Sequence, residues 1–110
     1  MNIQIFGKRK CFETKKAQRW FKERGIKFQY IDILDYGISK GELKSVVSAV
    51  GIDNVVDEND QDYPMYKYLA NNESKFEKLL EDPYLIKTPI VRNSKKATVG
   101  YEPEIWKIWE

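Results

Sequence analysis

The first 32 residues show a strand pattern, a helix pattern and a second strand pattern in succession. Residues 2–6 predict a short buried strand, and residues 26–32 alternate between apolar and polar side chains like a second strand. Between them, Ala17, Trp20 and Phe21 recur at helical spacing, with Lys and Arg at intervening positions. A strand–helix–strand unit places its two strands parallel in one sheet.

Residues 39–82 carry helical rather than strand patterns. Ser39 and Glu42 form a capping box, which predicts the start of a helix. Its apolar stripe, which we expect in the core, consists of Leu43, Val46, Val47 and Val50. The next segment, residues 53–62, is acidic, has no periodicity and predicts a loop.

Two further helices are predicted before residue 83. The first starts at Tyr63-Pro64, and its expected apolar face comprises Met65, Tyr66 and Leu69. A second capping box, Ser74 with Glu77, is expected to open the other helix. Asp82-Pro83 ends that helix, because the residue before a proline avoids the helical conformation.

The last part of the chain predicts two strands and a helix. Residues 89–92 and 97–101 are strand-like and flank a polar segment, which is typical of a β-hairpin. Pro103 suits the first turn of a final helix. Trp106 and Trp109 are expected to pack that helix on the sheet.

The order of these elements is β-α-β, then helices, then β-β-α. It predicts an α/β thioredoxin-like fold, with βαβ and ββα halves around a mixed sheet and a helical insertion at about residues 39–82. No linker or repeat divides the chain, so residues 1–110 are predicted to form a single domain.

Composition limits the chemistry of the chain. It has no histidine, which excludes a Cys–His or Ser–His–Asp nucleophile and any imidazole metal site. No segment approaches the roughly 18 consecutive apolar residues of a transmembrane helix, so no membrane association is expected. The N-terminus lacks a signal-peptide pattern, and a single cysteine cannot form an internal disulfide. We therefore expect a cytoplasmic protein.

Cys11, the single cysteine, is expected at the junction between the first strand and the first helix. Unpaired N–H groups and the positive end of the helix dipole favour an anion at such a junction. A thiol there, with cations nearby, can have a pKa well below its reference value of about 8.5. We interpret Cys11 as a reactive thiolate. The alternative is a small, inert, buried side chain.

Charge is unevenly distributed along the chain. Residues 1–27 hold nine Lys and Arg against two Glu, whereas residues 53–62 hold five acidic residues and no cation. Either both segments are solvated faces, or Lys8, Arg9 and Lys10 form an anion-attracting rim around the cysteine. Few aromatic residues accompany the basic ones in a stacking arrangement, so direct nucleic-acid binding is not expected.

Three segments together resemble a known family. The first is Ile5-Phe6-Gly7 followed by Lys10-Cys11 and Thr14-Lys15-Lys16-Ala17. The second, residues 82–90 (DPYLIKTPI), is similar to a P-x-L-I-x-R-P-I segment, and the third is Val99-Gly100-Tyr101 ahead of the last helix. In this order and spacing they resemble the arsenate reductase/Spx family of thioredoxin-fold proteins. The resemblance implies that Cys11 is the catalytic nucleophile and that Thr88-Pro89, with a cis peptide bond, shapes the docking site beside it.

The chain departs from this family at positions that matter for chemistry. The resemblance implies arginines that hold the oxyanion, but this chain has Thr88 before the proline, Tyr101 after the glycine and no arginine in residues 53–64. Neither Thr nor Tyr replaces the planar fork of arginine, so little arsenate reduction is expected. Thr14 stands where Spx-type proteins carry the second cysteine of a C-x-x-C switch. Its hydroxyl is either a donor to the thiolate or part of an ordinary helix start.

Two hypotheses for function follow. The first is a single-cysteine thiol oxidoreductase, in which Cys11 attacks an oxyanion or a disulfide and an external thiol, glutathione or a glutaredoxin, resolves the adduct. The substrate-binding residues would be Lys8, Arg9, Lys10, Thr14, Thr88 and Pro89. No metal or tightly bound cofactor is expected. The alternative is an Spx-like regulatory module that contacts a protein partner such as RNA polymerase.

Overall fold

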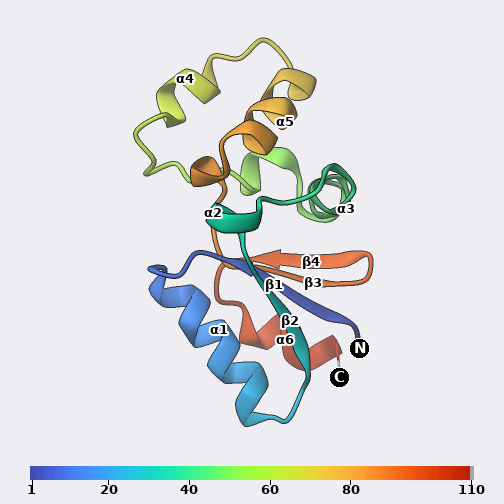
Figure 1. Ribbon diagram of the computed structural model, residues 1–110. Helices are drawn as coiled ribbons and strands as arrows, with labels where there is room; N and C mark the ends of the chain where they lie inside the picture. The colour runs from blue at the N-terminus through green and yellow to red at the C-terminus, as the bar shows by residue number, and fades with distance from the viewer. Residues whose placement is uncertain (110) are drawn as a thin grey trace.

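A four-stranded mixed sheet lies at the centre of the computed structural model, which describes residues 1–109 (Figure 1). The strands are β1 (Ile3–Gly7), β2 (Phe28–Asp32), β3 (Ile90–Asn93) and β4 (Lys96–Val99), in the order β2-β1-β3-β4. β1 pairs parallel with β2 and antiparallel with β3, which pairs antiparallel with β4. The predicted parallel βαβ unit and C-terminal hairpin are therefore confirmed.

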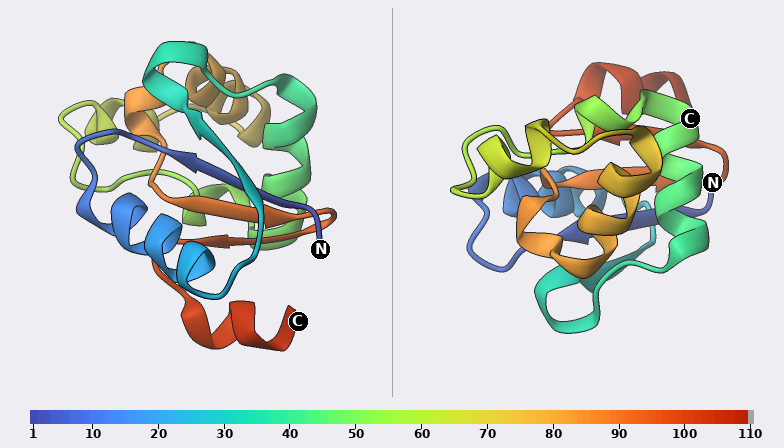
Figure 2. Two further views of the ribbon diagram at one scale, coloured as in Figure 1. Left: turned by 60° about the horizontal axis from the view of Figure 1, so that its bottom comes forward. Right: turned by 90° about the horizontal axis from the view of Figure 1, so that it is seen from above.

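Helices cover both faces of the sheet (Figure 2). α1 (Phe12–Glu23) and α6 (Pro103–Trp109) lie on one face, where Ile3, Ile5 and Val91 pack with aromatic side chains of these helices. The helices between β2 and β3 lie on the other face, over Phe6 and Ile90. Successive strand residues point to opposite faces, which is why neighbours such as Ile5 and Phe6 belong to different hydrophobic clusters.

The helical insertion between β2 and β3 begins before the predicted range of residues 39–82 and has more elements than the sequence predicts. It comprises α2 (Ile33–Tyr36), α3 (Lys40–Val50), α4 (Tyr63–Lys67) and α5 (Asn72–Glu81), with short 3₁₀ turns at Ile52–Asn54 and Pro83–Leu85. The Ser39–Glu42 capping box of α3 is confirmed, with both of its hydrogen bonds present. α2 has only four residues, too few to produce a detectable periodic pattern.

Two predictions within the insertion are wrong. Asn71, not Ser74, caps α5, because its side-chain oxygen accepts a hydrogen bond from the Ser74 amide at 2.8 Å. Asparagine is a favoured N-cap residue, and α5 therefore begins three residues before the position that the predicted Ser74–Glu77 capping box indicated. In α4, Tyr66 is buried as expected, but Met65 is 60% exposed. A helix of five residues turns only one narrow face to the core.

The C-terminal elements follow the prediction with small differences. Only Ser94 and Lys95 separate β3 from β4, so the hairpin turn is tighter than the polar segment indicated. α6 packs on the sheet through Trp106, which is fully buried and donates from Nε1 to Thr98 Oγ1 at 2.8 Å. Ile105 and Ile108 are exposed on the outer side of the same helix.

Candidate functional site

Cys11 lies at the N-terminus of α1, where the sequence predicts it. It is the N-cap residue of that helix, and its backbone amide donates to the Lys8 carbonyl at 2.9 Å, which closes the turn between β1 and α1. Its side chain is partly exposed. The Sγ atom lies 3.6 Å from the Thr88 carbonyl oxygen, and the Thr88-Pro89 peptide bond is cis, as expected. The end of β1 and the start of β3 thus bring the two residues together.

The surroundings of the sulfur stabilise its ionised form. Burial acts to raise the pKa of the Cys11 thiol, but hydrogen bonds from the Thr14 and Thr88 side chains and from the Thr14 and Glu13 amides outweigh it. The pKa is therefore lowered from its ordinary value. The expected contribution of the helix N-terminus is present as these two amide donors. Hydrogen bonds are the largest causes of the lowered pKa, and the thiolate in turn attracts the ammonium group of Lys8, which acts to raise the pKa of that lysine.

Thr14 occupies a confined position one turn after the cysteine. The residue is 1% exposed, and its Oγ1 atom makes no hydrogen bond to another protein atom among the described residues. Gly7 packs against it so closely that a Cβ at that position would lie 2.9 Å from Oγ1. The hydroxyl is thus left to donate to the Cys11 sulfur when that sulfur is ionised, which lowers the pKa of the thiol.

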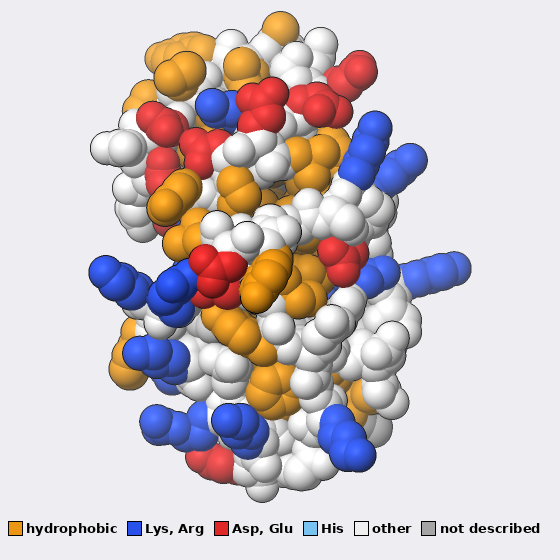
Figure 3. Space-filling view, in the orientation of Figure 1, with side chains coloured by type: hydrophobic (Ala, Val, Ile, Leu, Met, Phe, Trp, Pro, Cys, Tyr) orange, Lys and Arg blue, Asp and Glu red, His pale blue; other side chains and the backbone are white. Residues whose placement is uncertain are grey.

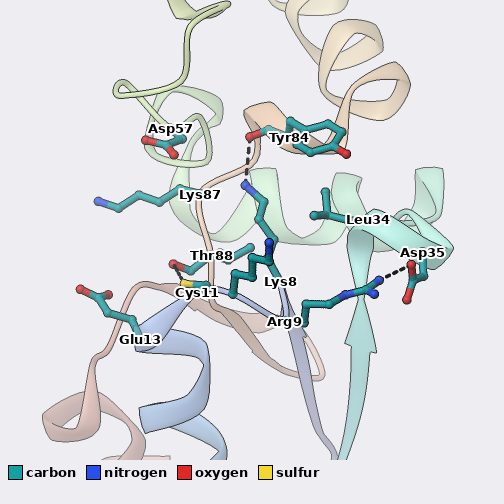
Figure 4. Close-up of a pocket in the computed structure, with 11 residues that line it drawn as sticks. Lys8, Arg9, Cys11, Glu13, Leu34, Asp35, Asp57, Tyr84, Lys87 and Thr88 are labelled. Carbon is teal, nitrogen blue, oxygen red and sulfur yellow. Dashed lines mark hydrogen bonds and ion pairs between the residues drawn. The ribbon is translucent and has the colours of Figure 1, made fainter.

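Lys8 and Arg9 do not extend freely into the site (Figure 4). Lys8 Nζ donates to the carbonyl oxygens of Tyr84 at 2.9 Å and Ile86 at 2.7 Å, and burial lowers its pKa. Arg9 pairs with Asp32, at 3.3 Å from Nε to Oδ2, and with Asp35. Both cations are next to Cys11 in sequence, but their charges are directed to protein acceptors.

A cleft of about 750 Å³ opens beside the sulfur. Its lining comprises Lys8, Arg9, Lys10, Cys11, Glu13, Leu34, Asp35, Asp57, Tyr84, Lys87 and Thr88. Lys10 and Lys87 form no ion pair within residues 1–109, whereas Glu13, Asp35 and Asp57 bring carboxylates to the same cleft. The cleft therefore carries both signs of charge rather than a purely basic rim.

Sequence reasoning missed part of this lining. Asp57 belongs to the acidic segment that was assigned to a loop, and Tyr84 lies within the family-like segment at 82–90. Arg92, a further cation near the proline, is directed away and donates to Gln4 Oε1 at 2.6 Å and Ser45 Oγ at 3.2 Å. On the face shown in Figure 3, most acidic side chains lie over the helical insertion and most basic ones over the half that contains α1, with exceptions in both halves.

No group of three or more Cys, Asp or Glu side chains is arranged to hold a metal ion within residues 1–109. None of the described helices is long and apolar enough to cross a membrane.

Comparison with known proteins agrees with this geometry. The sequence model of the ArsC family matches residues 6–108. The chain belongs to the ArsC family. This ArsC-family protein is 31% identical over 112 residues to global transcriptional regulator Spx 2 of Oceanobacillus iheyensis, a match that covers 94% of the chain and 80% of that relative. The family resemblance of the sequence is thus confirmed.

Solved structures confirm the fold. The ArsC-family chain superimposes on an arsenate reductase from Vibrio cholerae with a TM-score of 0.84 and 24% identity, covering 96% of this chain and 94% of that one. A more distant likeness, to the glutaredoxin-like protein NrdH-redoxin from Escherichia coli, has a TM-score of 0.51 and 13% identity and covers 100% and 96% of the two chains. The predicted thioredoxin-like fold is confirmed.

Proposed function

We propose that this protein is a single-cysteine thiol oxidoreductase whose substrate is a disulfide. The observation that carries the proposal is the set of hydrogen-bond donors around Cys11, which lowers the pKa of its thiol. Only the thiolate attacks a disulfide, so these donors increase the reactive fraction near neutral pH. The partly exposed sulfur at the edge of an open cleft is accessible to a substrate of this kind.

The reaction consists of two exchanges. The Cys11 thiolate attacks one sulfur of a mixed disulfide, the new Cys11–sulfur bond forms, and the other sulfur leaves as a thiolate that takes up a proton. An external thiol then attacks the adduct, forms a disulfide with the bound group and releases the Cys11 thiolate. The sequence has one cysteine, so the second thiol comes from outside the chain. Glutathione or a glutaredoxin supplies it as a co-substrate, with no tightly bound cofactor, in the reducing cytoplasm.

The charges of the cleft favour a disulfide over a small oxyanion. Lys8 donates to backbone carbonyls and Arg9 pairs with two carboxylates, so neither side chain is free to bind a substrate anion. A tetrahedral oxyanion is best bound by the two parallel hydrogen bonds of a free guanidinium group. Glu13 and Asp57 line the same cleft and oppose a multiply charged anion. Lys10 and Lys87 suit the single carboxylates of a peptide thiol.

We assign the remaining site residues as follows. Thr14 holds the thiolate through its hydroxyl, and Thr88 contacts the sulfur while the backbone at Thr88-Pro89 forms the docking edge. Lys10 attracts the anionic part of the substrate. Lys8 and Arg9 shape the loop around Cys11 rather than contact the substrate directly.

A turnover assay tests the proposal. The protein is incubated with a glutathionylated peptide and excess glutathione, and the release of peptide thiol is followed. We expect turnover that Cys11→Ser abolishes, and little arsenate reduction when arsenate replaces the peptide with glutathione and glutaredoxin present. Robust Cys11-dependent arsenate reduction, or equal peptide release by wild type and Cys11→Ser, contradicts the proposal.

A second candidate function is regulatory. The 31% identity to an Spx-named transcriptional regulator favours it. In this role the protein would contact RNA polymerase, without an internal disulfide switch because Thr14 replaces the second cysteine. A pull-down with purified RNA polymerase distinguishes the two: binding that persists in Cys11→Ser, without disulfide turnover by the wild type, supports the regulatory function.

A further inference from the structure

We propose that Lys8 is a positioning residue that sets the reactivity of Cys11 by holding residues 84–88 against the cysteine loop. This inference rests on the proposed role of Cys11 as the nucleophile. Lys8 reaches the carbonyl oxygens of Tyr84 and Ile86 with one ammonium group, at 2.9 and 2.7 Å. Hydrogen bonds from a charged donor are shorter and stronger than neutral ones, so this is a firm attachment.

The segment that Lys8 holds is bonded to protein along both edges. On one edge, the Asp57 amide donates to the Leu85 carbonyl and the Lys87 amide donates to the Val55 carbonyl, each at 2.7 Å. Tyr84 and Leu85 lie in the 3₁₀ turn Pro83–Leu85, and Ile86 follows in extended conformation. The carbonyl oxygens of Tyr84 and Ile86 accept from the Lys8 ammonium group, so Lys8 adds an attachment to a side of the segment that Val55 and Asp57 do not reach. Thr88 follows two residues after the second of these carbonyls.

Lys8 also forms a direct hydrogen bond with Cys11. Its backbone carbonyl accepts from the Cys11 amide at 2.9 Å, while its side chain bonds to the chain two residues before Thr88. One residue therefore connects the two sides of the contact between Cys11 Sγ and Thr88 (Figure 4). Loss of the Lys8 side chain would free residues 84–88 to move and would weaken the hydrogen bond from the Thr88 hydroxyl to the thiolate.

The test measures the alkylation rate of Cys11 with iodoacetamide as a function of pH. Three variants are compared with the wild type: Lys8→Met, Thr88→Val and the double variant. Lys8→Met keeps a long side chain at this position but removes its hydrogen-bond donors. We expect Lys8→Met to shift the pH midpoint upward and to slow alkylation at pH 7 by roughly three- to tenfold. In the Thr88→Val background the same substitution should have much less effect, because the two residues act through one contact.

A matched control separates this role from simple loss of charge. Lys10→Met removes a cation from the same loop, and Lys10 has no protein ion pair among residues 1–109. The proposal is overturned if both lysine variants slow alkylation equally, if the Lys8→Met effect is the same in the Thr88→Val background, or if it disappears in high salt. The first and third results indicate a screened charge, and the second means that Lys8 does not act through Thr88.

Folding is monitored in the same samples by thermal unfolding. Should Lys8→Met be too unstable to assay, Lys8→Leu, which also lacks donors, replaces it, with the same criteria. A lowered Tm with an unchanged pH midpoint assigns Lys8 a purely structural role and also overturns the proposal. Alkylation requires no substrate, so failure of the disulfide turnover assay leaves this test intact.

Discussion

The Sγ atom of Cys11 lies 3.6 Å from the carbonyl oxygen of Thr88, 77 residues further along the chain. In its neutral form, the thiol donates a hydrogen bond to that carbonyl oxygen. On ionisation this bond is lost, and the sulfur accepts from the Thr14 and Thr88 side chains and the amides of Glu13 and Thr14. The site thus offers the sulfur one acceptor as a thiol and several donors as a thiolate, which favours the thiolate.

The Thr14 hydroxyl should control the reactivity of Cys11. Thr14→Val keeps the shape of this buried side chain but removes the donor. A hydrogen bond to a charged group contributes about 1.5–3 kcal/mol, and partial exposure of the sulfur reduces this, so alkylation at pH 7 should slow by roughly tenfold or less. Thr14→Ser, which retains the hydroxyl, is the matched control and should react nearly as the wild type does. Equal rates in Thr14→Val and wild type contradict the assigned role.

Stability should depend on pH through Cys11. Because hydrogen bonds lower the pKa of this thiol in the folded state, its ionisation stabilises the fold above the unfolded-state pKa of about 8.5. This stabilisation is lost as the pH falls through the lower folded-state pKa. Urea unfolding under reducing conditions should therefore show that the difference in unfolding free energy between wild type and Cys11→Ser increases with pH across this window. A difference that is constant or falls with pH has the wrong sign.

Gly7 should not tolerate a side chain. A Cβ at this position would enter the space of Thr14, so Gly7→Ala should both destabilise the fold, by about 1–3 kcal/mol, and slow alkylation of Cys11. Gly41, in the first turn of α3, has open space around it and provides the contrast. Gly41→Ala should stabilise the protein by up to about 1 kcal/mol and leave alkylation unchanged. Thermal unfolding and the alkylation rate check both variants.

Trp106 should be the main anchor of α6. It is fully buried, contacts Trp20 and Phe21 at ring-centroid distances of 5.4 and 5.1 Å, and donates to Thr98. Trp106→Ala should lower the free energy of unfolding by about 3–5 kcal/mol. Ile108→Ala, on the exposed side of the same helix, should change it by less than about 0.5 kcal/mol. Similar losses in the two variants would mean that α6 does not pack in solution as it does in the structure.

Local patterns predicted most of the elements and the place of the nucleophile. The spacing of Ala17, Trp20 and Phe21 indicated α1, and the strand pattern before it placed Cys11 at the N-terminus of that helix. The capping box at Ser39 gave the start of α3 correctly. The start of α5 was misassigned because Asn71 and Ser74 both have capping preference, and only the hydrogen bond from the Ser74 amide decides between them.

The electrostatics of the site could not be predicted in this way. Lys8 and Arg9 precede Cys11 in the sequence, which suggested an anion-attracting rim, but their acceptors come from residues 84–86 and from Asp32 and Asp35. Asp57, from the acidic segment, lines the same cleft. The sequence shows which charged residues lie near Cys11 along the chain. Whether their charges act on the sulfur depends on hydrogen-bond and ion-pair partners that are remote in sequence.

The sequence by itself determined the order of strands and helices, the family and the position of Cys11 at a helix N-terminus, because periodicity, capping and turn preferences act over a few residues. Only the tertiary structure decided which donors reach the sulfur and where the lysine and arginine side chains are directed. The contacts of Lys8 and of Cys11 with residues 84–88 join positions up to 78 apart because β1 and β3 pair side by side, and Arg9 reaches Asp32 and Asp35 because β1 also pairs with β2. Side-chain partners at that separation leave no local pattern in the sequence.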